Sequence, residues 1–172
     1  MRKLVLLAVL ALVAVPAAFA LDSTTPTDQA SLLCKQQRTA IGAAAFKLLY
    51  GGGNNAYGRC VSKLASTVGA DTANASKQCA AERADATFPD THGGKTFAQF
   101  YGTGPHGNNA FGKCVSGKAK TQEDAQQQAT ISAAKTCKAE RASLGAAAFT
   151  KKYGGHSNAF GKCVSQTAQS NP

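Results

Sequence analysis

Six cysteines are the residues of this chain whose spacing most clearly predicts chemistry. In chain order, cysteines that open and close a repeated motif are 26, 35 and 26 residues apart: Cys34 and Cys60, Cys79 and Cys114, Cys137 and Cys163. No Cys-x-x-Cys pair occurs, which argues against a zinc site and a thioredoxin-like redox centre. An even number of cysteines in an exported chain favours disulfides. We therefore expect disulfide bonds, and neither a metal nor a cofactor.

Histidine and serine side chains give little indication of catalysis. The three histidines lie in glycine-rich segments without a neighbouring acidic or cysteine cluster: His92, His106 and His156. A serine follows the last cysteine of each motif: Ser62, Ser116 and Ser165. A nucleophilic serine needs a positioned base and an oxyanion hole, and the sequence indicates neither. We expect no catalytic residue.

Six cations recur at equivalent positions and are the candidates for anion binding. An arginine lies four residues after the first cysteine of each motif: Arg38, Arg83 and Arg141. A cation directly precedes the second cysteine: Arg59, Lys113 and Lys162. A guanidinium group suits carboxylate or phosphate. The alternative, which the sequence favours, is a structural role, in which the cation satisfies carbonyl groups at the end of its own helix or lies across the last helix of the motif.

These residues belong to a motif that occurs three times. Each copy begins with Cys-x-x-(Glu/Gln)-Arg, continues with a Phe and, four residues later, a Tyr-Gly pair, and ends with Asn-Ala-(Phe/Tyr)-Gly-(Lys/Arg)-Cys-Val-Ser. The first and third copies match at 17 of 29 positions over 34–62 and 137–165. The middle copy has nine extra residues, in 84–96 and 102–109, and their Pro, Gly and Asp content is typical of surface loops. The two places where these extra residues are inserted therefore predict three helical pieces per copy, with two loops between them.

The three pieces position the cysteines. The stretch around the first cysteine is rich in the helix formers Ala, Gln and Lys, and the last piece begins at an asparagine that suits an N-cap. If the first and last helices are antiparallel, their cysteines come level, so we predict pairing within each motif, one of 15 connectivities. A bridge closing such a loop contributes on the order of 3–4 kcal/mol. The predicted fold is all-α, with three tandem disulfide-stapled helical modules.

The organisation follows from these pieces. A helical connector is expected at 120–133, within one long helix over 113–141, because that stretch has no proline. The connector at 67–75 contains Gly69 and Asp71, which predict a break. The expected segments are a signal peptide (1–20), a disordered tail (21–30), module 1 (31–66), the connector 67–75, module 2 (76–119), the connector 120–133, module 3 (134–169) and a short tail (170–172).

The N-terminus indicates export. A basic start, Met1-Arg2-Lys3, precedes the apolar run 4–15, and Ala18-Phe19-Ala20 resembles a cleavage site. The apolar run is short for a membrane span of about 20 residues. We expect a secreted monomer, extracellular or associated with the cell wall, without a membrane span. Its net charge after cleavage would be about +10 − 2 = +8.

The phrase AFGKCVS, after CKAER and AAAF-x-x-x-YG, resembles the cysteine-paired repeat of exported actinobacterial proteins without assigned activity. The resemblance covers roughly 34–165. It implies a secreted bacterial protein, and it carries no catalytic or binding residues to this chain.

Charge gives the expected function. Modules 1 and 3 each carry a net charge of +5, whereas module 2 carries +2. We expect an exported, non-catalytic structural or binding protein that engages an anionic extracellular or cell-envelope polymer through modules 1 and 3. Specific nucleic-acid binding is not expected, since there is no tryptophan or stacking platform. The alternatives are a secreted enzyme with its site in the module 2 loops, and a cationic antimicrobial or nucleic-acid-binding protein.

Overall fold

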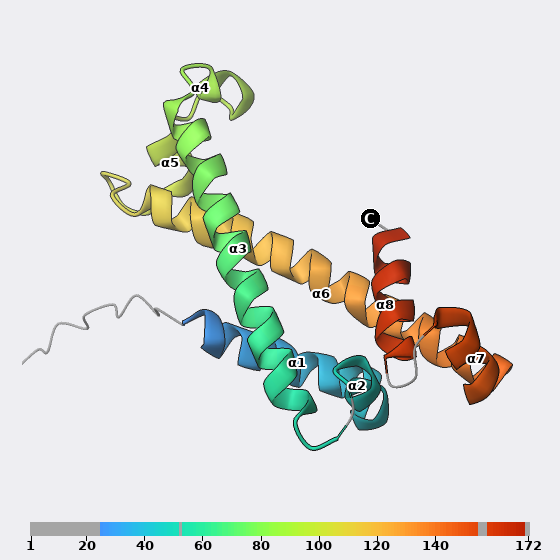
Figure 1. Cartoon of the computed structure of the whole chain (residues 1–172). Helices are drawn as coiled ribbons and strands as arrows, with labels where there is room; N and C mark the ends of the chain where they lie inside the picture. Colours follow the sequence, from blue (N-terminus) through green and yellow to red (C-terminus); the bar gives the residue numbers. More distant parts are fainter. Residues whose placement is uncertain (1–24, 52, 155–157, 171–172) are drawn as a thin grey trace, which may run out of the picture.

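A computed structural model describes residues 25–51, 53–154 and 158–170, and within these ranges the chain is all-α, as the sequence predicts. The predicted signal peptide 1–20 lies outside the described residues, as do 21–24 and 171–172. The helices are α1 (Pro26–Ile41), α2 (Ala43–Leu49), α3 (Ala56–Ala84), α4 (Phe88–Thr91), α5 (Phe97–Tyr101), α6 (Ala110–Leu144), α7 (Ala146–Tyr153) and α8 (Ala159–Ser170) (Figure 1). None of them is long and apolar enough to cross a membrane.

Helix α1 begins earlier than the sequence analysis predicts. Thr25 caps it, because its hydroxyl accepts from the backbone N–H of Asp28 while the Asp28 carboxylate accepts from the N–H of Thr25. Pro26 then occupies the first turn, where its missing N–H costs nothing. The prediction of a disordered tail is therefore wrong for residues 26–30, which are helical. At the other end, Ser170 belongs to α8 and not to the predicted tail.

Helix α3 is continuous through the connector that was predicted to be broken. Gly69 costs about 1 kcal/mol relative to alanine within a helix, and packing of α3 against α1 and α6 outweighs this cost. Asp71 is buried, and its carboxylate accepts a hydrogen bond of 3.1 Å from Gln126 of α6. The break predicted at 67–75 is therefore wrong. The long helix predicted over 113–141 is confirmed by α6.

The three disulfides join the predicted pairs: Cys34–Cys60, Cys79–Cys114 and Cys137–Cys163. Each bridge connects the first and last helices of one module, with a Cα–Cα distance of 6.0 Å in all three. The sulfurs are fully buried. Because α3 and α6 each continue from one module into the next, the modules share these two helices (Figure 1).

The molecule has two hydrophobic cores of unequal size. The larger one combines buried residues of modules 1 and 3, among them Ile41, Phe46, Tyr50, Ala134, Phe149 and Phe160. The smaller one lies in module 2 and contains Phe88 and Phe97 around the Cys79–Cys114 bridge. Modules 1 and 3 approach closely, since a Cβ added to Gly161 would lie 3.3 Å from the carbonyl oxygen of Leu49 in α2. Modules 1 and 3 therefore form one body, which we call the 1–3 body, and module 2 extends from it (Figure 1).

A buried polar layer joins α1 to the middle of α6. Gln37 donates a hydrogen bond of 2.7 Å to Gln127, which in turn donates to the carbonyl oxygen of Leu33. Further along, Gln29 donates to the carboxylate of Glu123. Glu123 and Asp71 are both only 5% exposed, and one carboxylate oxygen of each has no hydrogen-bond partner in the described structure. Burial, and then the charge of Asp71, raises the pKa of Glu123.

Candidate anion-binding site

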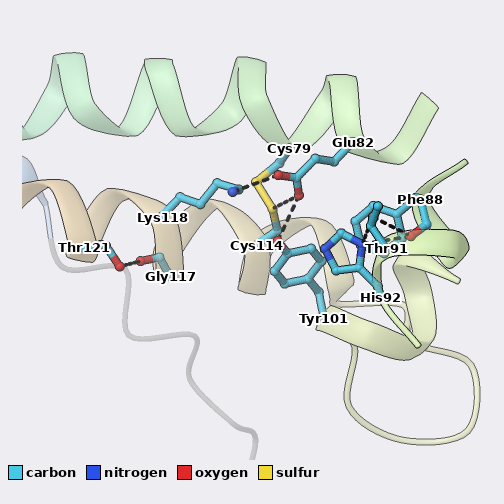
Figure 2. A network of polar contacts seen from close by, with 10 residues as sticks. All are labelled: Cys79, Glu82, Phe88, Thr91, His92, Tyr101, Cys114, Gly117, Lys118 and Thr121. Carbon is cyan, nitrogen blue, oxygen red and sulfur yellow. Dashed lines mark hydrogen bonds and ion pairs between the residues drawn. A yellow bond between two sulfur atoms is a disulfide. The ribbon is translucent and has the colours of Figure 1, made fainter. Parts of the chain in front are cut away.

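The acidic residue of the repeated motif holds a tyrosine in each of modules 2 and 3. Figure 2 shows the module 2 group, in which the Tyr101 hydroxyl donates to Glu82 at 2.9 Å and Lys118 pairs with the same carboxylate at 2.8 Å. One Glu82 oxygen lies 3.9 Å from Sγ of Cys114. In module 3, Tyr153 donates to Glu140 at 2.7 Å. In both modules the tyrosine–glutamate hydrogen bond therefore holds the short helix, α5 or α7, close to the disulfide.

Module 1 has glutamine at the corresponding position. Gln37 is 1% exposed and accepts from the Tyr50 hydroxyl at 2.5 Å, while its amide group faces α6. A carboxylate there would be buried between uncharged hydrogen-bond partners, which is costly. Burial raises the pKa of Tyr50 to about 12, and the hydrogen bond to Gln37 opposes that shift. The substitution of Gln for Glu therefore fits the packing of module 1 against α6.

The glutamates at this motif position in modules 2 and 3, Glu82 and Glu140, stay ionised. Burial raises the pKa of Glu82, but the hydrogen bonds from Lys118 and Tyr101 outweigh it and hold the pKa below its ordinary value. Hydrogen bonds from Lys152 and Tyr153 lower the pKa of Glu140. The Glu/Gln of the motif is therefore an internal structural partner, and it does not neutralise the arginine that follows it.

Two of the six candidate cations contact the end of a short helix. Lys162 donates a hydrogen bond to the carbonyl oxygen of Gly154, at the end of α7. The guanidinium of Arg59 lies against Gly51, just after α2, where a Cβ would displace it. Both roles are structural, but they serve the preceding short helix and not the end of the cation's own helix, which the sequence analysis predicts. Lys113, at the same position in module 2, is exposed.

The arginines of the motif are arranged differently. The Arg83 guanidinium lies over the ring of Phe111, 4.8 Å from its centroid. Arg38 and Arg83 are exposed, whereas Arg141 is half-buried. A guanidinium that is stacked on a ring keeps its N–H donors directed to solvent and loses less freedom when it binds an anion.

The exposed arginines line hollows. In module 1 a hollow of about 150 Å³ is lined by Arg38, Ala43, Phe46, Lys47, Gly53, Asn54, Ala56 and Tyr57. An open hollow of about 350 Å³ adjoins it, shares Arg38, Ala43 and Tyr57, and adds Lys35 and Thr39. We call this pair the module 1 hollow. Module 1 contains no acidic residue, so the lining cations have no anionic partner within their module.

The module 2 hollow has corresponding walls. It measures about 430 Å³, and its lining includes Arg83, Phe97, Asn108 and Phe111, which occupy the same motif positions as Arg38, Phe46, Asn54 and Tyr57. The extra loop residues enlarge it with Asp85, Phe88 and Pro89. The same motif therefore builds a hollow with an arginine, two aromatic rings and an amide in both modules. Sequence analysis identified the arginines, but it missed the rings and asparagines as lining residues.

The histidines and serines lie elsewhere. His92 stacks on Phe88 with ring centroids 3.7 Å apart, and its Nδ1 is 2.8 Å from the Phe88 carbonyl oxygen (Figure 2). His106 is exposed, neither residue lines the module 2 hollow, and His156 lies outside the described residues. The Ser116 hydroxyl donates to the Gly112 carbonyl within its own helix, and Ser62 and Ser165 are exposed. Within the described residues no group of three or more His, Cys, Asp or Glu side chains could hold a metal ion.

Comparison with known proteins adds no assignment: no protein-family model, no curated protein and no solved structure matches this chain.

Proposed function

We propose that this is an exported, non-catalytic binding protein that engages an anionic polymer through the 1–3 body. One observation carries the proposal: modules 1 and 3 have a net charge of +5 each, and they pack around a single core. Their cations therefore belong to one packed body and not to two separated ends. The summed field of a strongly cationic body attracts polyanions and speeds their encounter.

The acidic residues support the same interpretation. Glu140 is the only acidic residue of the two modules, and Lys152 and Tyr153 already occupy it. The remaining acidic residues lie in module 2, in the connectors and near the N-terminus. Three disulfides favour an oxidising compartment, which agrees with the predicted export.

Retention on immobilised polyanions over a salt series tests this proposal. The protein is applied to a polyol phosphate, a polyuronate and neutral dextran, from about 0.02 M to about 1 M salt, where the Debye length shrinks from roughly 20 Å to 3 Å. We expect retention on a polyanion at low salt, loss of retention as salt rises, and no retention on dextran. Absence of retention at low salt would overturn the proposal.

A matched pair of variants locates the binding surface. K135Q/K151Q removes two exposed cations from module 3, and K77Q/K95Q removes two exposed cations from module 2, so the net charge changes equally. The first variant should elute at clearly lower salt than the second. Equal effects would contradict a role for the 1–3 body.

A further inference from the structure

We propose that the module 1 and module 2 hollows are two copies of one binding site, each taking the carboxylate or phosphate of a sugar or polyol unit. This inference rests on the proposed function: the module 1 hollow belongs to the 1–3 body, and the module 2 hollow adds a second, weaker contact outside that body. Its basis is that Arg38, Phe46, Asn54 and Tyr57 line one hollow while the residues at the same motif positions line the other.

The walls fit a charged group on a ring or carbon chain. A guanidinium presents two parallel N–H donors to carboxylate or phosphate, and in module 2 its ring partner Phe111 holds it in place. Tyr57 and Phe111 are half-buried and offer apolar ring surface to the ring or chain of the unit, whereas Phe46 and Phe97 are buried. Asn54 or Asn108 offers an amide for its hydroxyls. The next asparagine of the motif, Asn55 or Asn109, is not assigned to the site. The Asn109 amide already donates a hydrogen bond of 2.6 Å to the Thr103 hydroxyl.

The two hollows differ in charge. Lys35 and Lys47 add cations to the module 1 hollow. The module 2 hollow has Asp85 in its lining, and hydrogen bonds from Thr87 lower the pKa of that carboxyl, which keeps it charged at neutral pH. The module 1 hollow is therefore the stronger anion site. Two linked weak sites bind a repeating polymer more tightly than either alone.

Arginine-to-lysine variants separate this inference from general electrostatics. R38K/R83K keeps the net charge but removes the paired N–H donors, and it should weaken binding to the retained polyanion about tenfold, the equivalent of one charge-assisted hydrogen bond. R38K alone should have a larger effect than R83K. Comparing polyol phosphate with polyuronate shows which anionic group is bound.

N54D/N108D provides a second route, because it places a carboxylate in each hollow at exposed positions. It should abolish retention at salt concentrations where K77Q/K95Q is still retained. Thermal melting and circular dichroism establish that each variant is folded. If both variants are folded, R38K/R83K binds like the wild type and N54D/N108D binds like K77Q/K95Q, the hollows are not the site, although salt-dependent retention of the wild type would leave the proposed function standing. If the wild type is not retained at all, both proposals fail.

Discussion

The hydroxyl of Tyr50 donates a hydrogen bond of 2.5 Å to the side-chain oxygen of Gln37, at the one motif position where modules 2 and 3 have glutamate. Because Gln37 is 1% exposed and its side-chain hydrogen-bond partners are the uncharged Tyr50 and Gln127, a carboxylate there would lose hydration with little compensation. We expect Q37E to lower the free energy of unfolding at pH 7 by about 2 kcal/mol or more. Chemical denaturation measures this directly.

The reverse change is the control. E140Q removes a carboxylate that is partly exposed and ion-paired with Lys152 at 2.6 Å, so it should destabilise the protein much less than Q37E does. Burial would raise the pKa of a glutamate at position 37, so the destabilisation by Q37E should shrink at acidic pH. Equal losses for Q37E and E140Q would show that burial does not explain the glutamine.

Tyr50 should make the protein sensitive to alkali. Its pKa is raised to about 12 in the folded state by burial, whereas the unfolded chain ionises near 10. Below pH 10 both states keep the proton, so stability is lost as the pH rises from about 10 through about 12, by up to about 2–3 kcal/mol. Y50F lacks this group and should show a smaller loss over the same interval. Matching pH profiles for the two proteins would contradict the prediction.

Glu123 should limit stability near neutral pH. The pKa of Glu123 is raised in the folded state, so folding favours its protonated form. The resulting contribution to the free energy of unfolding is complete below the ordinary carboxyl pKa and is lost as the pH rises through the raised value. The groups that act on it are Asp71 from α3, Gln29 from α1, and Asp124 and Lys120 on its own helix.

The test is E123Q, which supplies a donor where Asp71 and Glu123 each have an oxygen without a partner. The variant should be more stable than the wild type at pH 7, by about 1 kcal/mol, and the difference should vanish in acid. D124N, an exposed change on the same helix, serves as the control. A less stable E123Q at pH 7 would show that the two carboxylates are satisfied by another group.

The disulfides should differ in how far their loss spreads. Each loop closure contributes about 3–4 kcal/mol, but Cys79–Cys114 lies in the small module 2 core and Cys34–Cys60 in the shared core. Native-state hydrogen exchange of C79S/C114S should show lost protection confined to the module 2 end. C34S/C60S should lose protection across α1, α3 and α8. Uniform loss in both variants would contradict the two-core organisation.

Local pattern was sufficient to predict the all-α fold and the disulfide pairing, because each copy of the motif repeats the same residues at the same helical spacing. It also contained the capping signal Thr25-Pro26-Thr27-Asp28, which was overlooked at the start of α1. The break at 67–75 was predicted from Gly69 and Asp71 alone. It is absent because α3 packs against α1 and α6, and because Gln126, 55 residues away, pairs with Asp71.

The shared core and the hollows depend on contacts that local pattern does not contain. Gln37 meets Gln127 across 90 residues of sequence, and Gly161 meets α2 from another module. The sequence likewise shows six recurring cations. It does not show that Arg59 and Lys162 contact the end of a short helix, because those contacts depend on the tertiary structure.

The order of the bridges along the chain also bears on how the protein would withstand proteases. Every non-helical stretch between Cys34 and Cys163 falls inside one of the three closed loops, while the segments between loops, 61–78 and 115–136, are entirely helical. Proteases cut extended, accessible backbone most readily, and such backbone is concentrated in loops. A single nick at any of these exposed turns would therefore leave both fragments covalently joined, so the molecule would stay in one piece until its cystines were reduced.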